Sequence, residues 1–118
     1  MRAANPQKLD AVFHALADTT RRRMIDRLSA GPASVTELAQ PLAMALPSVT
    51  KHLAVLETSG LVASQKNGRV RTYCIAPDGL AEVEAWVAMR KARWNAQFDR
   101  LDLLLAAEKI PARRRKRE

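Results

Sequence analysis

The chain has 118 residues, of which 47% are hydrophobic and only 4% are aromatic. That length fits one domain, and the apolar fraction is enough for a core of aliphatic side chains, which excludes wholesale disorder. No run approaches about eighteen apolar residues and the start has no apolar signal core, so we expect a cytoplasmic protein without a membrane partner. The single cysteine, Cys74, excludes an internal disulfide and a multi-cysteine metal cage within one chain.

The charge balance is strongly basic, with 20 Lys and Arg residues against 12 Asp and Glu residues and a net charge of +8. The last six residues hold five positive charges and one negative charge, so half of the net charge lies in the body of the chain. A basic small domain favours a polyanionic partner, with nucleic acid first and an anionic membrane surface second. Charge that serves only solubility is the alternative.

Residues 1–7 are polar and are predicted to form a flexible arm. Four apolar residues at helical spacing then predict a short amphipathic helix: Leu9, Val12, Phe13 and Leu16. Asp18 is the expected N-cap of a second helix, which Gly31 and Pro32 should end. The inward stripe of that helix is Met24, Ile25 and Leu28.

A capping box, Ser34 with Glu37, predicts a third helix over about 35–40 that Pro41 stops or bends. A fourth helix over 46–58 follows, and Pro47 is tolerated in its first turn. The stripe expected to face the core is Leu46, Val49, Leu53 and Leu56.

The period then changes to that of strands. Two short β-favouring runs, 61–66 and 69–75, are joined by Asn67 and Gly68. An Asn-Gly link of this kind predicts a hairpin with a type I′ turn, which needs positive φ at both positions.

A final helix over 80–107 is predicted because the segment contains neither Gly nor Pro. Leu80, Val87, Trp94 and Leu101 recur at heptad spacing, with Val83 and Phe98 beside them. At 1.5 Å per residue the helix would span about 42 Å, more than a compact domain of this size can cover. We therefore expect a second copy of the chain to cover its apolar stripe.

The predicted fold is mainly α with a β-hairpin, in the winged helix-turn-helix order of four helices, two strands and one helix. The expected division is a flexible arm over 1–7, the domain over 8–107, and a basic tail over 108–118.

Two basic or small-residue surfaces are candidates for DNA contact. The outer face of the fourth helix carries side chains that, apart from Lys51, are short enough to approach base edges: Pro47, Ser48, Thr50, Lys51 and Ala54. The hairpin tip carries Lys66, Arg69 and Arg71 without an acid, which suits phosphates or a minor groove. The alternatives are an ordinary solvated helix face and cations that protect an edge strand.

Three further features leave alternatives open. Arg21, Arg22 and Arg23 begin a helix, where they oppose its dipole, so they serve either a phosphate or packing. His52 suits a phosphate contact or a buried hydrogen bond equally well. No grouping of the two histidines, Cys74 and the carboxylates resembles a catalytic site, so we expect no enzyme.

Several motifs resemble the ArsR/SmtB family of bacterial transcriptional repressors. They are Val35-Thr-Glu-Leu-Ala39, Leu46-Pro-Ser-Val-Thr-Lys-His-Leu53, Leu56-Glu-Thr-Ser-Gly-Leu-Val62, Gly68-Arg69 with Tyr73, and Phe13-His-Ala-Leu-Ala-Asp-Thr-Thr-Arg-Arg22. The resemblance covers about 8–95. The form of Glu37-Leu-Ala-Gln-Pro41 is similar to the branch that does not bind metals and is often encoded beside START-like proteins.

The resemblance implies a homodimer formed by the first and last helices, an operator with two-fold symmetry, and repression relieved by a signal, such as an unidentified small molecule. By position it assigns DNA contacts to Ser48, Thr50, Lys51, His52 and Arg69. The implied dimer interface joins Leu9, Val12 and Phe13 with the stripe of the last helix.

Two departures from the family argue against metal sensing. Ser34 and Thr36 stand where metal-sensing members carry cysteines, and no histidine follows His52. We expect no metal and no cofactor. The competing hypothesis is a winged-helix module for protein or RNA contacts with a nonspecific basic tail.

Overall fold

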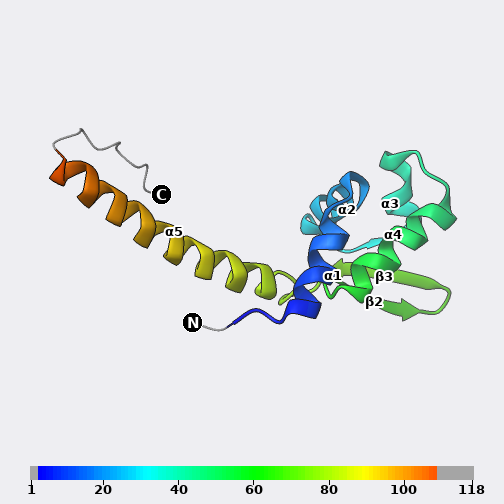
Figure 1. The fold of residues 1–118 in the computed structure, drawn as a ribbon. Coiled ribbons are helices and arrows are strands. Elements are labelled where there is room, and N and C mark those ends of the chain that lie inside the picture. Colours follow the sequence, from blue (N-terminus) through cyan, green and yellow to red (C-terminus); the bar gives the residue numbers. More distant parts are fainter. Residues whose placement is uncertain (1–2, 109–118) are drawn as a thin grey trace.

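The computed structural model of the chain describes residues 3–108. In chain order its elements are α1 (Pro6–Leu16), α2 (Thr19–Ser29), β1 (Ala33–Ser34), α3 (Val35–Leu42), α4 (Leu46–Thr58), β2 (Val62–Asn67), β3 (Val70–Ile75) and α5 (Ala81–Ala107). The first four helices and the strands gather at one end, from which α5 extends alone (Figure 1). None of the helices in the described part is long and apolar enough to cross a bilayer.

The architecture confirms the mainly helical winged helix-turn-helix fold. One strand was not expected: β1 pairs with β3, and the antiparallel sheet has the order β1-β3-β2. Ala33 lies opposite Tyr73 in this pairing, and both side chains are buried. Two residues are too few to show the alternation by which a strand is recognised in sequence.

Side-chain caps fix where α1, α2 and α3 begin. The carboxylate of Asp18 accepts the N–H of Arg21 at 3.0 Å, as expected. The capping box is also confirmed, because Ser34 N–H donates to Glu37 at 3.0 Å and Glu37 N–H donates to Ser34 at 3.3 Å. Asn5 caps α1 through the N–H groups of Gln7 and Lys8, so the helix begins within the range predicted as an arm.

The end of α3 differs from the prediction by two residues. Pro41 lies inside the helix, which continues to Leu42. A proline there costs only the hydrogen bond of its own missing N–H, because the helix is about to end. Ala43 then reverses the chain with a φ of 52°.

The hairpin turn is displaced by one residue from the predicted Asn67-Gly68 position. Asn67 pairs with Val70, which leaves Gly68 and Arg69 as the two turn residues. Gly68 has a φ of 66° whereas neither Asn67 nor Arg69 has positive φ. A single positive φ at the first turn position is the pattern of a type II′ turn with glycine leading, so the type I′ prediction was wrong.

One apolar core lies beneath α4. Val49, Leu53 and Leu56 of its predicted stripe are fully buried, but Leu46 is 48% exposed because it begins the helix outside the core. From α1, Leu9 and Val12 are buried within the protomer, Val12 to 1% exposure. Their assignment to the dimer interface stays a prediction.

Helix α5 has no buried residue. Near its start Val83 packs partly on the core, and Phe13 of α1 meets Trp86 edge-on with ring centroids 5.8 Å apart. The guanidinium of Arg90 lies over the Trp86 ring, 4.7 Å from the ring centroid. Beyond these contacts α5 exposes the predicted interface residues Val87, Trp94, Phe98 and Leu101 together with Leu103 and Leu104.

Candidate nucleic-acid interface

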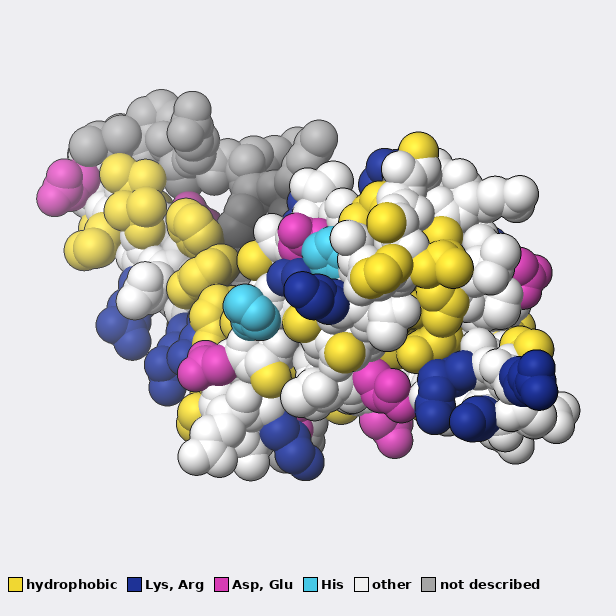
Figure 2. All heavy atoms as spheres, turned by 90° about the vertical axis from the view of Figure 1, so that its right-hand side faces the viewer, with side chains coloured by type: hydrophobic (Ala, Val, Ile, Leu, Met, Phe, Trp, Pro, Cys, Tyr) yellow, Lys and Arg dark blue, Asp and Glu magenta, His cyan; other side chains and the backbone are white. Residues whose placement is uncertain are grey.

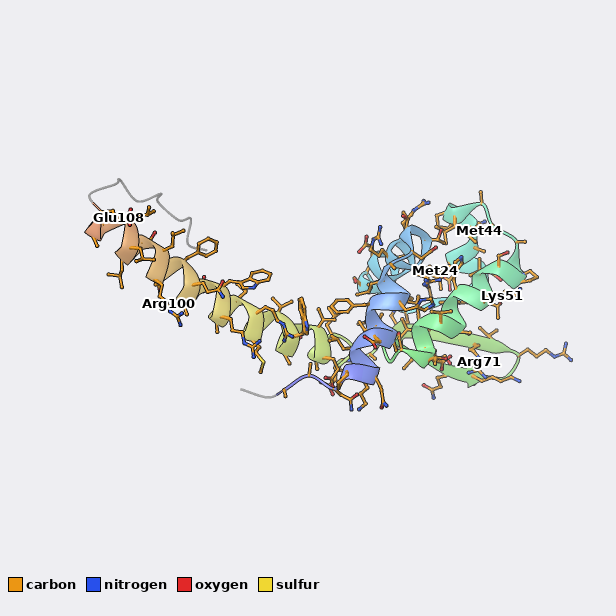
Figure 3. The ribbon with its side chains drawn as sticks, in the orientation of Figure 1. Met24, Met44, Lys51, Arg71, Arg100 and Glu108 are labelled. Atoms are coloured by element: carbon orange, nitrogen blue, oxygen red, sulfur yellow. The ribbon has the colours of Figure 1, made fainter. Side chains whose placement is uncertain are left out.

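The outer face of α4 is accessible because its opposite face is fixed on the core. Pro47, Ser48, Thr50 and Lys51 are all exposed. The Thr50 hydroxyl donates to the carbonyl of Leu46 at 3.0 Å, which directs its lone pairs outward for a second contact. Figure 3 places Lys51 at the end of the molecule away from α5. The helix therefore presents small polar groups and one cation on a rigid support.

The N-terminus of α4 has no side-chain cap. Ala45 occupies the N-cap position, and the N–H groups of Ser48 and Val49 both turn back to its carbonyl. Pro47 has no N–H to satisfy. The positive end of the helix dipole is therefore uncovered by any acidic or hydroxyl side chain, which favours a nearby anion.

Of the three predicted basic residues of the hairpin, two are exposed near the turn and the third is engaged in a hydrogen bond. Lys66 and Arg69 are exposed near the turn. Arg71 donates to the Ser64 hydroxyl at 2.8 Å, and that hydroxyl donates to Glu57 of α4 at 2.7 Å. Arg71 therefore links the hairpin to α4 as well as adding charge.

Arg69 does not lie on the strand beside Arg71, because it belongs to the turn. The second strand, which was expected over 69–75, therefore begins one residue later, at Val70. Lys66 is the cation that lies opposite Arg71 in the strand register. Figure 2 faces this end of the molecule and shows basic side chains gathered at its lower right.

A polar cluster that sequence reasoning did not assemble joins α2 to α4. The guanidinium of Arg21 donates to the carbonyls of Ala15 at 2.7 Å and His14 at 3.0 Å, which close the end of α1. It also lies 3.3 Å from Nδ1 of His52, and Asp18 lies 3.8 Å from the same nitrogen. His52 is thus engaged inside the fold through one ring nitrogen.

These contacts indicate that the arginine run at the start of α2 serves packing, one of the two roles considered for it. Arg22 donates to the carbonyl of Leu16 and to the Thr19 hydroxyl, so two of the three arginines serve packing by capping α1. The hydrogen bond from the Arg21 N–H lowers the pKa of Asp18, against a smaller opposing effect of desolvation. The carboxylate is therefore ionised at neutral pH and offsets the cations at this helix start.

A hollow of about 460 Å³ lies between α2, the end of β3 and the start of α5. Apolar groups line most of it, among them Leu16, Ile25, Leu61 and Leu80. Within residues 3–108 no group of three or more His, Cys, Asp or Glu side chains is placed to hold a metal ion.

Comparison with known proteins agrees with this geometry. A family model described as a helix-turn-helix domain matches residues 16–65. The HTH-type transcriptional regulator Rv2034 of Mycobacterium tuberculosis is 46% identical over 72 residues, which are 61% of this chain and 67% of that protein. The arsenical resistance operon repressor of Escherichia coli is 35% identical over 96 residues, 80% of this chain and 79% of that protein.

Two solved structures extend the likeness to three dimensions. An ArsR family transcriptional regulator shares 49% identity at a TM-score of 0.75, with 80% of this chain and 97% of that chain covered. A homodimeric winged helix-turn-helix DNA-binding domain from Mycobacterium bovis shares 26% identity at a TM-score of 0.60, over 77% of this chain and 84% of that one. The chain belongs to the ArsR family of DNA-binding, winged helix-turn-helix transcriptional regulators.

Proposed function

We propose that the protein is a homodimeric repressor that reads an inverted-repeat operator with α4 and grips the DNA backbone with its hairpin. The observation that carries this proposal is the exposed face of α4, which combines short polar side chains with an uncapped helix start. Base edges in the major groove accept such short side chains, while Lys66 and Arg69 suit phosphates.

The exposed stripe of α5 supports the dimer. Its large apolar side chains include Trp94, Phe98 and Leu101, of which Trp94 is 55% exposed. Apolar surface of this kind is expected to be buried by association. A two-fold dimer would set two α4 helices about 34–36 Å apart, which matches successive major grooves and requires an operator with two-fold symmetry.

Repression in this proposal is relieved by a signal other than a thiolate-bound metal. The Escherichia coli relative is named for arsenical resistance, but Ser34 and Thr36 stand at the positions to which the family resemblance assigns metal-binding cysteines. We propose that the inducer is a small molecule. We propose no catalytic step.

Selection of DNA from a random-sequence pool tests the proposed function, because it requires no prior operator. We expect an inverted repeat to be enriched. Arg69→Ala should weaken binding to all sequences and reduce the slope of log affinity against log salt by about one unit. Thr50→Ala should instead lower the ratio of specific to nonspecific affinity.

Two outcomes would contradict the proposal. A pool that yields no enriched sequence with the unmodified protein would remove sequence-specific binding. Two variants that behave alike across sequences and salt concentrations would remove the division of work between α4 and the hairpin turn.

A further inference from the structure

The side chains of Arg21 on α2 and His52 on α4 are in contact, and this contact connects the two helices. Arg21 is anchored by its Nε atom to the Ala15 carbonyl at 2.7 Å and by one terminal nitrogen to the His14 carbonyl at 3.0 Å. Its other terminal nitrogen lies 3.3 Å from Nδ1 of His52. A planar guanidinium held at two points has little freedom to turn its third donor elsewhere.

The chemistry of the two groups fixes where the proton of the imidazole lies. A guanidinium only donates hydrogen bonds, so Nδ1 of His52 must be the acceptor. An imidazole that accepts at Nδ1 carries its single proton on Nε2 when it is neutral. A proton on Nδ1 would point at another donor.

The competing assignment gives the Nδ1 proton to Asp18, but the geometry does not favour it. Asp18 Oδ2 lies 3.8 Å from Nδ1, beyond hydrogen-bond distance. That same oxygen already accepts the N–H of Arg21 at 3.0 Å.

The other ring nitrogen faces outward. The interactions of the His52 ring in the described structure are all at Nδ1. No buried side-chain nitrogen or oxygen of the described residues lacks a partner, so Nε2 reaches solvent through the 23% of the side chain that is exposed. Histidine side chains are visible at the surface of this end of the molecule (Figure 2). The ring therefore offers an N–H on α4 beside Lys51.

We propose that Arg21 is a positioning residue that holds His52 in the neutral tautomer protonated at Nε2, and that this N–H donates to a DNA phosphate. The inference rests on the proposed function for its second half. Arg21 itself does not touch the DNA. It acts by anchoring the ring to the end of α1, so that the donor is oriented before DNA arrives and less ordering is needed on binding.

Nitrogen-15 spectra of the histidine rings test the first half without DNA. Near pH 8, where free imidazole is neutral, we expect His52 to show only the Nε2-protonated form, while the exposed His14 samples both forms. His14→Gln assigns the two sets of signals. Arg21→Lys keeps the positive charge but removes the planar guanidinium with its fixed N–H donors. His52 should then sample both forms.

Arg22→Met is the matched control, since Arg22 also caps α1 and does not contact His52. It should leave the His52 tautomer unchanged. A proton on Nδ1 in the unmodified protein, or the same mixture at His52 and His14, would overturn the proposal.

DNA binding tests the second half, with the fragment selected by the unmodified protein. His52→Leu should weaken binding about tenfold, as expected for a lost hydrogen bond to a charged group. His52→Gln, which can place an amide N–H near the Nε2 position, should weaken it less. In an Arg21→Lys background His52→Leu should cost much less than tenfold, because the donor is already disordered.

Helical circular dichroism and melting of each variant separate these effects from misfolding. Equal losses for His52→Leu in both backgrounds would refute the positioning role. Failure of the unmodified protein to select any DNA would remove the proposed function and the phosphate contact with it, whereas the tautomer would still decide what Arg21 does to His52.

Discussion

The lowered pKa of Glu37 makes the stability of the protein depend on pH. The N–H of Ser34, followed by the Ser34 hydroxyl, holds this pKa below its ordinary value. A carboxyl with a lowered pKa in the folded state stabilises the protein above its unfolded pKa, and this contribution is lost as pH falls through the folded pKa.

We therefore expect Glu37→Gln to lower the free energy of unfolding near pH 7 and to have a smaller effect at an acidic pH below the lowered pKa of Glu37, where the carboxyl of the folded, unmodified protein is protonated. Denaturant titrations at the two pH values measure the difference. Thr36→Ala, at an exposed neighbouring position, is the control and should show no such pH dependence. A gap between wild type and Glu37→Gln that widened in acid would contradict the assignment.

Zinc provides a second test at the residue scale. Ser34 and Thr36 offer no thiolate, and residues 3–108 contain no cluster of three metal-binding side chains. We expect stoichiometric zinc to leave operator affinity unchanged. Calorimetry that detected a tight zinc site coupled to loss of DNA binding would be contrary to this expectation.

Residue roles were predictable from sequence where they depend on local chain geometry. The bond between Ser34 and Glu37 and the bond between Asp18 and Arg21 each lie within one helical turn. The spacing of the residues was therefore sufficient to predict both helix caps. The pairing of Arg21 with His52 spans 31 positions, and no local pattern encodes it. The candidate site was therefore predicted as a set of exposed residues, without the contacts that orient them.

At the scale of elements, the hairpin turn depends on Gly68. Its φ of 66° is unfavourable for a residue with a Cβ atom, while nothing lies within 4 Å of the position where that atom would stand. Gly68→Ala therefore acts through backbone strain alone, which costs on the order of 1–2 kcal/mol.

Denaturant unfolding should show that loss for Gly68→Ala and little change for Asn67→Ala, whose φ is not positive. DNA affinity should also fall for Gly68→Ala, because the turn carries Arg69. Equal stability of the two variants would show that the turn adopts another conformation.

The helices were predictable because apolar periodicity and capping signals coincide in them. The turn was displaced because both Asn67-Gly68 and Gly68-Arg69 satisfy the short-range rules for two-residue hairpins. Strand β1 escaped prediction because it exists only through its pairing with β3, some forty positions away. Sequence patterns thus located the elements better than their partners.

At the scale of the whole molecule, the shape follows from α5. The radius of gyration is 20.2 Å, against about 13 Å expected for a compact chain of this length. The difference reflects α5, which extends away from the other elements and holds no buried residue.

Trp94→Asp should yield monomers that keep their helical signal and lose most operator affinity, since burial of the ring contributes a few kcal/mol per subunit. Ala96→Asp adds the same charge on roughly the opposite side of α5 and should remain dimeric. Light scattering decides between the two states. Unmodified protein that scattered as a 13.1 kDa species at micromolar concentration with DNA binding intact would show the dimer to be wrong.

Because α5 has no buried residue in the protomer, the melting temperature of the protein should depend on its concentration. Under the proposed pairing, mass action makes association part of the folding equilibrium, so the melting temperature falls as the protein is diluted. Dilution would separate protomers and deprive both copies of α5 of their cover. In a cell that makes few molecules, a larger fraction would be monomers with a lower melting temperature. Repression would then increase with copy number more steeply than in direct proportion.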